Sequence, residues 1–225
     1  MDFNINITPR FGNACPNFVG AKVYAEIQNT RFSDSLWKEI DAFTASFTES
    51  YTTDDIKRIP SIEATRSAYR RCGKDPSRYR PSGEALIRRI LKGNSLYQID
   101  TAVDLINLSS MKFGYSIGGF DADKIEGTDL TLDIGQEGEP YEGIGRGELN
   151  IAGLPVYRDS IGGIGTPTSD NERTKIGLST TRLLIIINGY DGNKENVAAC
   201  AEFTKELLCQ HASCNLCEIS FFQYF

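Results

Sequence analysis

The sequence predicts an α+β fold, in which mixed β-sheets pack against helices, and three observations lead to this class. Helical periodicity dominates residues 33–111, short β-rich runs separated by glycines follow over residues 130–187, and one late helix precedes a final strand. Helices grouped before strands, without a regular alternation of the two, favour α+β over a parallel α/β sheet. With 225 residues, of which 40% are hydrophobic, the chain is large enough for one domain spanning residues 1–225.

The first half of the chain is expected to be mainly helical after one strand. Residues 22–27 alternate in polarity, which predicts a strand. Ser33 is a suitable N-cap for a helix that reaches about residue 47, because Leu36, Ile40 and Phe43 recur at helical spacing after it. Further helices are expected over residues 61–72, 82–91 and 100–111.

The second half changes to short β-like runs with many glycines between them. Strands are expected over residues 130–134, 154–157 and 183–187, followed by a helix over residues 195–209 and a last strand over residues 216–222. Two glycine-rich stretches, residues 114–121 and 159–165, are expected to form loops.

Composition and the first residues bear on the class and location of the protein. The longest apolar run, residues 183–187, is far too short to cross a bilayer, so no membrane association is expected. The chain begins without a basic segment followed by an apolar stretch, which argues against a secretory signal and for a cytoplasmic protein. Six cysteines in this setting are expected to be free thiols.

One group of residues has the chemistry of metal ligands: Cys209, His211, Cys214 and Cys217. Thiolates and an imidazole at such spacing are compatible with zinc. A second spaced pair is missing, and these residues fall on an expected helix and strand. We therefore interpret them as structural residues, expect no metal and no cofactor, and keep the zinc site as an alternative.

Positive charge is concentrated in one segment of an acidic chain. The net charge is −6, yet residues 57–92 hold eleven Lys and Arg against three acidic residues, a local charge of +8. Such a segment attracts phosphates, although a solvated helical surface or pairing with acidic residues explains it equally well. The candidate RNA-binding side chains are Arg70, Arg71, Lys74, Arg78, Arg80, Arg88 and Arg89.

The sequence offers little support for the common catalytic motifs. Its one histidine, His211, lies outside both glycine-rich stretches, and nucleophile-histidine hydrolases need a histidine beside the nucleophile. No nucleophile elbow and no phosphate-binding P-loop is present. The glycine-rich stretches remain as candidate sites, because bare glycines let backbone N–H groups approach a ligand and hold a developing oxyanion. Ordinary β-turns are the alternative interpretation.

Several short motifs, taken in order, resemble one known family. Residues 114–121, with Asp123-Lys124-Ile125 after them, resemble the Gly-x-Pro-Leu-His-Ala-Phe-Asp…Lys-Ile signature of the B3/B4 editing module of the phenylalanyl-tRNA synthetase beta subunit. Asp104-x-x-Asn107 is similar to the Asp-x-x-Asn-Tyr that precedes this signature, and residues 162–164, after Asp159, to its Gly-Gly-Ile loop. Arg80-Pro81-Ser82 resembles the free-standing branch of the family, and the likeness covers residues 59–188.

The resemblance implies a mixed α+β domain and a role in translation quality control. Synthetase members hydrolyse the ester of tyrosine wrongly joined to the phenylalanine tRNA, and free-standing relatives are thought to act in trans on mischarged tRNA. The chain departs from the family in two places. Gly118 stands where the signature has histidine, and the glutamate after the Gly-Gly-Ile loop has no secure counterpart. Specificity for tyrosine is therefore not expected to carry over.

The leading hypothesis is hydrolysis of mischarged aminoacyl-tRNA by a positioned water. Gly118, Gly119, Gly162 and Gly163 would supply oxyanion-holding N–H groups. Asn107, Ser160 and Thr180 would orient water or the amino acid. Asp121 or Asp170 would receive the substrate ammonium group.

Two alternatives stay open: a non-catalytic tRNA- or RNA-binding module, and a small-molecule protein that binds an amino acid. Salt-sensitive RNA affinity separates the RNA-binding hypotheses from the last one. The partner expected is mischarged tRNA, with no obligate protein partner.

Overall fold

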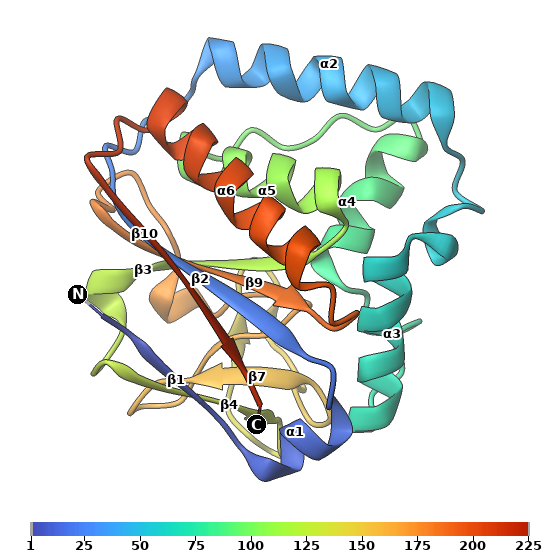
Figure 1. The fold of residues 1–225 in the computed structure, drawn as a ribbon, viewed down its shortest axis with the longest axis vertical. Coiled ribbons are helices and arrows are strands. Elements are labelled where there is room, and N and C mark those ends of the chain that lie inside the picture. Colours follow the sequence, from blue (N-terminus) through green and yellow to red (C-terminus); the bar gives the residue numbers. More distant parts are fainter. Residues whose placement is uncertain (1, 225) are drawn as a thin grey trace.

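The computed structural model describes residues 2–224 and shows three layers (Figure 1). Helices α2, α4, α5 and α6 form the upper layer, a four-stranded antiparallel sheet lies below them, and a second four-stranded sheet forms the lower layer, while α3 runs along one side and α1 lies beside the lower sheet. The helices are α1 (Pro9–Ala14), α2 (Asp34–Ser50), α3 (Pro60–Cys72), α4 (Ser82–Leu91), α5 (Thr101–Phe113) and α6 (Lys194–His211). Helices and sheets are thus segregated, and the α+β class predicted from the sequence is confirmed.

The upper sheet, called here the central sheet, has the strand order β10-β2-β9-β3. Its strands are β2 (Val19–Glu26), β3 (Ser116–Asp121), β9 (Arg182–Gly189) and β10 (Leu216–Gln223). Alternate residues of β9 pack into two different hydrophobic cores. Ile185 packs with the helices, whereas Leu184 and Ile186 pack toward the lower sheet. Burial on both faces explains why β9 is an almost continuous apolar run.

The lower sheet is mixed and has the strand order β1-β4-β7-β8. Its strands are β1 (Asn4–Ile7), β4 (Asp129–Ile134), β7 (Pro155–Arg158) and β8 (Gly163–Gly165). Strand β1 runs parallel to β4, and the other pairs are antiparallel. A small hairpin, β5 (Glu142–Gly143) and β6 (Gly147–Glu148), lies between β4 and β7 in the chain, and three 3-10 turns complete the fold: η1 (Ile56–Arg58), η2 (Ala122–Lys124) and η3 (Glu172–Thr174).

Local sequence signals set the helix ends. The Ser33 hydroxyl accepts a hydrogen bond from the Leu36 backbone N–H and begins α2, and Asp100 caps α5 in the same way. Helices α3 and α5 end at Gly73 and Gly114, whose φ angles of 94° and 71° lie in the left-handed region that glycine tolerates best.

The strands and helices expected from periodicity are present, with two corrections. Residues 114–121, expected to be a loop, contain strand β3, which is buried along its whole length. The glycines in it are not turn residues, because they lie between two packed layers where side chains would not fit. The second stretch expected to be a loop, residues 159–165, ends in strand β8, which pairs with β7. Strands β1, β5 and β6 and helix α1 had not been anticipated.

Two further expectations concern membranes and metals. Within residues 2–224, no helix combines the length and apolarity that a bilayer crossing needs. His211 contacts Ser35 Oγ and Glu39 Oε1, at 3.1 and 3.0 Å. In the part of the chain that the structure describes, no group of three or more His, Cys, Asp and Glu residues is arranged to hold a metal ion.

Candidate functional site

A pocket of about 440 Å³ opens between α4, α5 and the outer edge of β3. Its walls are mostly aliphatic, with Val103 and Ile106 from α5 and Ile176 from the segment after η3. The exposed side chains of Ile99 and Ile144 stand at its rim. The remaining lining residues are Ser82, Leu86, Asn107, Ser110, Ile117, Gly119, Asp170 and Lys175. An apolar cavity of this size with a few polar groups is typical of a small-molecule site.

Two other hollows of comparable size lack this combination. One lies between β10 and α6, and its walls are mainly apolar. The other lies between α1 and α3, where the guanidinium of Arg71 is already bonded to the Ala14 carbonyl and to Ser67 Oγ. The pocket beside β3 is therefore the candidate site.

Asp170 is held in the pocket by the edge of β3. Its Oδ2 accepts a hydrogen bond of 3.1 Å from the Gly119 backbone N–H. A β-carbon placed on Gly118 or Gly165 would lie 3.2 or 3.1 Å from Asp170 Oδ1 and within 3 Å of the Phe120 ring. Glycine at both positions is therefore what admits the carboxyl group between β3 and β8.

A short turn brings Asp170 to this place. Thr166 Oγ1 accepts hydrogen bonds from the N–H groups of Thr168 and Ser169, at 3.2 and 3.1 Å. The chain thus reverses after β8, and Asp170 forms a β-bridge with Gly165.

The environment of Asp170 changes its acidity. Desolvation raises the pKa of this carboxyl from 3.8 to about 7, and the hydrogen bond from Gly119 opposes the rise only in part. The residue as a whole is half-buried, but protein atoms surround its carboxyl group. Asp170 thus exchanges a proton near neutral pH, as a general acid or base must.

Asn107 is the second polar group of the pocket. It projects from α5 one turn after Asp104, which fixes the start of the helix by accepting hydrogen bonds from Trp37 Nε1 and the Ile99 N–H. Among residues 2–224 the Asn107 carboxamide has no hydrogen-bond partner, so both its donor and its acceptor remain available to a ligand.

The glycines beside Asp170 give a direct test of this geometry. We expect Gly165→Ala to lower the free energy of unfolding by about 1–3 kcal/mol, because its β-carbon would lie 2.5 Å from Phe120 Cζ in a packed interior. Gly177→Ala is the matched control, since a β-carbon there would have no atom within 4 Å. Chemical denaturation measures both, and equal stability of the two variants would contradict the packing described.

The structure brings together some of the site residues expected from the sequence and separates others. Asn107, Gly119 and Asp170 line the pocket, and Gly118 adjoins the Asp170 carboxyl. The others lie outside the pocket lining: Gly162, Gly163, Ser160, Asp121 and Thr180.

Local contacts explain the positions of these outlying residues. The Gly162 N–H donates to Asp159 Oδ1, and the Ser160 hydroxyl donates to the Glu126 carbonyl, at 3.1 and 3.0 Å. Thr180 Oγ1 donates to Asp121 Oδ2 at 2.8 Å, and the same carboxylate pairs with Lys124. These groups hold loops together.

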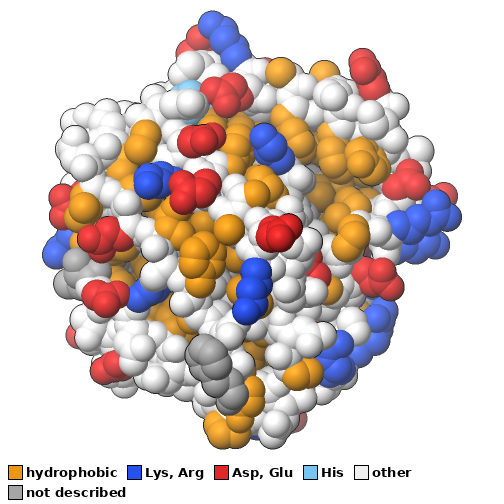
Figure 2. All heavy atoms as spheres, in the orientation of Figure 1, with side chains coloured by type: hydrophobic (Ala, Val, Ile, Leu, Met, Phe, Trp, Pro, Cys, Tyr) orange, Lys and Arg blue, Asp and Glu red, His pale blue; other side chains and the backbone are white. Residues whose placement is uncertain are grey.

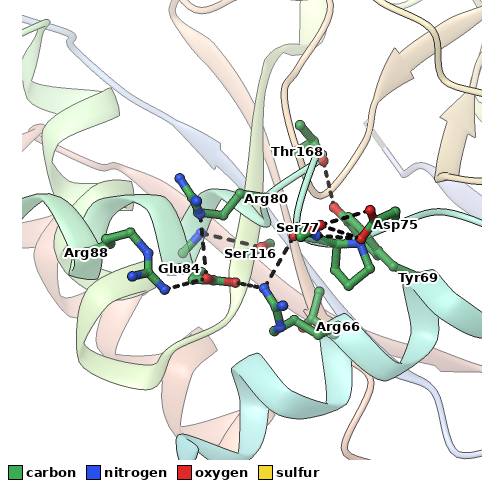
Figure 3. A network of polar contacts seen from close by, with 12 residues as sticks. Arg66, Tyr69, Asp75, Ser77, Arg80, Glu84, Arg88, Ser116 and Thr168 are labelled. Atoms are coloured by element: carbon green, nitrogen blue, oxygen red, sulfur yellow. Dashed lines mark hydrogen bonds and ion pairs between the residues drawn. The ribbon is translucent and has the colours of Figure 1, made fainter. Parts of the chain in front are cut away.

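Three arginines of the basic segment converge on one buried carboxylate (Figure 3). Glu84 is 2% exposed and lies 2.8 Å from Arg66, 3.0 Å from Arg88 and 3.5 Å from Arg80. The three cations come from α3, α4 and the loop between them, so Glu84 ties these elements together. The cluster has three positive charges against one negative and keeps an excess of positive charge.

Among the other basic residues of the described chain, some side chains are bonded within the protein and others are exposed without a partner. Lys74 is buried, donates to the Asn150 carbonyl and lies over the Tyr79 ring, so it is not a surface cation. Arg70 and Arg78 are exposed and make no side-chain hydrogen bond or ion pair within residues 2–224. Figure 2 shows Lys and Arg side chains along the right-hand edge, where α3 runs in Figure 1.

Comparison with known proteins decides the family. The family model described as the B3/4 domain matches residues 64–204, which include α4, α5, the pocket and two strands of the central sheet, β3 and β9. The chain belongs to the B3/4 domain family. The resemblance drawn from the sequence motifs is thereby confirmed, whereas a search of curated proteins gives no match.

A solved structure has a fold similar to that of this chain. The chain is similar to an N-terminal fragment of the phenylalanyl-tRNA synthetase beta subunit from Pyrococcus horikoshii, with 13% sequence identity and a TM-score of 0.50. The match covers 96% of this chain and 50% of the fragment, so the B3/4 protein spans about half the length of that relative. At this identity the likeness concerns the fold alone.

Some pocket residues of this B3/4 domain had no signal in the sequence. Ile99, Ile144 and Lys175 come from three separate segments, and only the tertiary fold brings them together. Glu84 had no signal either, since a lone glutamate among arginines looks like an ordinary exposed helix residue.

Proposed function

We propose that this protein hydrolyses the ester bond of mischarged aminoacyl-tRNA in trans, with the aminoacyl group bound in the pocket beside β3. The observation that carries the proposal is the convergence of an unpartnered carboxamide, Asn107, and a carboxyl with a pKa near neutrality, Asp170, on one apolar cavity. Membership of the B3/4 family and a fold similar to that of a phenylalanyl-tRNA synthetase beta-subunit fragment support an aminoacyl-tRNA ligand.

In this proposal Asp170 is the general base. The ionised carboxylate takes a proton from a water molecule as the water oxygen attacks the ester carbonyl carbon. The negative charge on the carbonyl oxygen is met by the Asn107 NH₂ group. The carbon–oxygen bond to the ribose then breaks, and Asp170 returns the proton to the departing ribose oxygen. The products are the free amino acid and uncharged tRNA.

The sequence suggested ammonium binding as another role for Asp170. A carboxyl that is half protonated at neutral pH is a weak receptor for a cation but a well-matched proton acceptor. We therefore assign it to proton transfer. The aliphatic walls would take an apolar amino-acid side chain.

The basic segment would bind the RNA backbone. Arg70 and Arg78 are exposed on α3 and the loop after it, and Ser82 of α4 lines the pocket only two residues after Arg80. Helix α4 thus has the Glu84 cluster on one side and the pocket on the other. Contacts with phosphates would position the acceptor end without reading its sequence.

A panel of mischarged tRNAs tests the proposal. We expect ester loss above the buffer rate for at least one tRNA carrying an apolar amino acid, and an affinity that falls as salt rises. Arg70→Ala combined with Arg78→Ala should weaken RNA binding and reduce its salt dependence. Lys194→Ala combined with Lys205→Ala on α6 removes the same charge and serves as the control. Hydrolysis of no member of the panel would exclude the catalytic proposal.

A second candidate function is binding of an amino acid or RNA without hydrolysis. It is favoured by one observation: the N–H groups of Gly119 and Gly162, expected to hold an oxyanion, are already bonded to Asp170 and Asp159. This candidate predicts saturable binding in the pocket with an unchanged ester half-life.

A further inference from the structure

An exposed aromatic side chain stands next to the candidate pocket. Tyr97 is 67% exposed, the most exposed of the large hydrophobic side chains within residues 2–224. The guanidinium of Arg89 lies over its ring at 3.9 Å from the centroid. Arg89 is fixed in turn, because its Nε donates to the Ser95 carbonyl at 2.6 Å. One face of the ring is therefore covered by a cation, and the high exposure leaves the rest of the ring open to solvent.

The pair lies next to two lining residues of the pocket in the chain, although neither Arg89 nor Tyr97 is itself part of the lining. Arg89 follows the pocket residue Leu86 by three positions on α4, so both lie on the same face of the helix. Tyr97 precedes the pocket residue Ile99 by two positions, a distance of at most about 7 Å along an extended chain. The Ile99 N–H is held by Asp104 Oδ1, which anchors the segment to α5.

We propose that Arg89 and Tyr97 form a stacking site for the 3′-terminal purine base of the RNA whose esterified ribose enters the pocket. This inference rests on the proposed function and names a contact for its RNA ligand. Aromatic rings and arginine planes bind unstacked bases by their π-faces, and single-stranded ends present such bases. The base and the ester belong to the same nucleotide, so a base platform beside an acyl pocket matches the shape of one aminoacylated end.

The other exposed aromatic residues lack these features. Tyr51 stacks on Phe47, at 4.5 Å between ring centroids, at the end of α2 and outside the pocket lining. Phe32 has no cation over its ring among the described residues. Phe221 is also exposed but has no cation over its ring among these residues. Within residues 2–224, Tyr97 alone combines high exposure, a fixed arginine and a position beside the pocket, and Tyr51 is a suitable control.

The test uses an uncharged tRNA acceptor-stem hairpin whose 3′-terminal adenine is replaced by 2-aminopurine, a base whose fluorescence falls on stacking. The full-length protein should quench this fluorescence. Tyr97→Ala should abolish the quenching and raise the Kd by about tenfold or more. Tyr97→Phe should retain both properties, and Tyr51→Ala should match the wild type. Circular dichroism verifies that each variant is folded.

The outcomes separate this inference from the proposed function. Absence of quenching by the wild-type protein, or equal quenching by Tyr97→Ala, overturns the stacking site. Because the hairpin carries no ester, quenching that depends on Tyr97 would support the site even if no mischarged tRNA were hydrolysed. Conversely, hydrolysis of mischarged tRNA without quenching would support the function and exclude the stacking contact.

Discussion

Asp170→Asn is expected to reduce ester hydrolysis by about 10²- to 10⁴-fold, the range associated with loss of a general base. The amide oxygen still accepts the hydrogen bond from Gly119, so the pocket keeps its shape, but the side chain no longer takes a proton. Single-turnover deacylation of a mischarged tRNA measures the effect, and binding of uncharged tRNA should not change. A variant with the wild-type rate would show that Asp170 is not the base.

The pH dependence follows from the same carboxyl. Because its pKa is about 7 and the ionised form is the active one, the wild-type rate should rise with pH through about 7 and level off above it. The residual rate of Asp170→Asn should lack this step.

Stability should respond to pH in the opposite sense. Between the unfolded pKa of 3.8 and the folded value of about 7, the folded state binds more protons, so its free energy of unfolding falls as pH rises. The difference between the two pKa values corresponds to an upper limit of roughly 4 kcal/mol. Asp170→Asn should therefore gain stability relative to the wild type above pH 7, and denaturation at pH 5 and pH 8 measures this gain.

Glu84→Gln is expected to cause the largest loss of stability, about 3 kcal/mol. The variant removes the carboxylate with which Arg66, Arg80 and Arg88 all pair and leaves three cations near one another. Arg88 Nε is buried and already lacks a partner within residues 2–224, which leaves it little freedom to find another. The partial exposure of the arginines keeps the expected cost at the lower end for a broken buried ion pair.

Glu202→Gln is the matched control for this experiment, because Glu202 is exposed in the middle of α6 and has no ion pair in the described part of the chain. Urea denaturation of both variants should show a large shift of the midpoint for Glu84→Gln and almost none for Glu202→Gln. A similar midpoint for both would mean that the arginines are adequately solvated without Glu84.

The predictable part of the fold is the part with strong periodicity. Helices α2 to α6 and strands β2 and β9 follow from the spacing of apolar residues and from caps such as Ser33 and Gly73. Strand β3 was missed, because Gly118 and Gly119 disfavour a strand on local propensity. Long-range packing decides there: Phe120 and Asp170 fill one side of the strand, and Ile106 and Ile176 fill the other.

The candidate site was only partly predictable from the sequence. The sequence identified Asn107 and Asp170 as candidate site residues, but it did not show how far apart the two glycine-rich stretches lie in the fold. Gly118 illustrates the reason. The family signature has histidine at this position, and here the carboxyl of Asp170, fifty-two residues away in the chain, occupies the adjoining space. A sequence shows the missing side chain but not the distant group that takes its place.

The surface charge of residues 57–92 was also only partly predictable from the sequence. The excess of arginine in residues 57–92 was visible, but the burial of Glu84 and Lys74 depends on packing between α3, α4 and the loop that joins them. The free cations are therefore fewer than the sequence suggested.

The most direct test of the central claim is a crystal structure with a non-hydrolysable 3′-aminoacylamido-adenosine that carries an apolar amino acid. We expect the amino-acid side chain to lie against Val103 and Ile106, and the amide carbonyl to lie between Asn107 and Asp170. An analogue bound elsewhere, or a pocket that stays closed to it at saturating concentration, would contradict the assignment of this pocket to an aminoacyl ester.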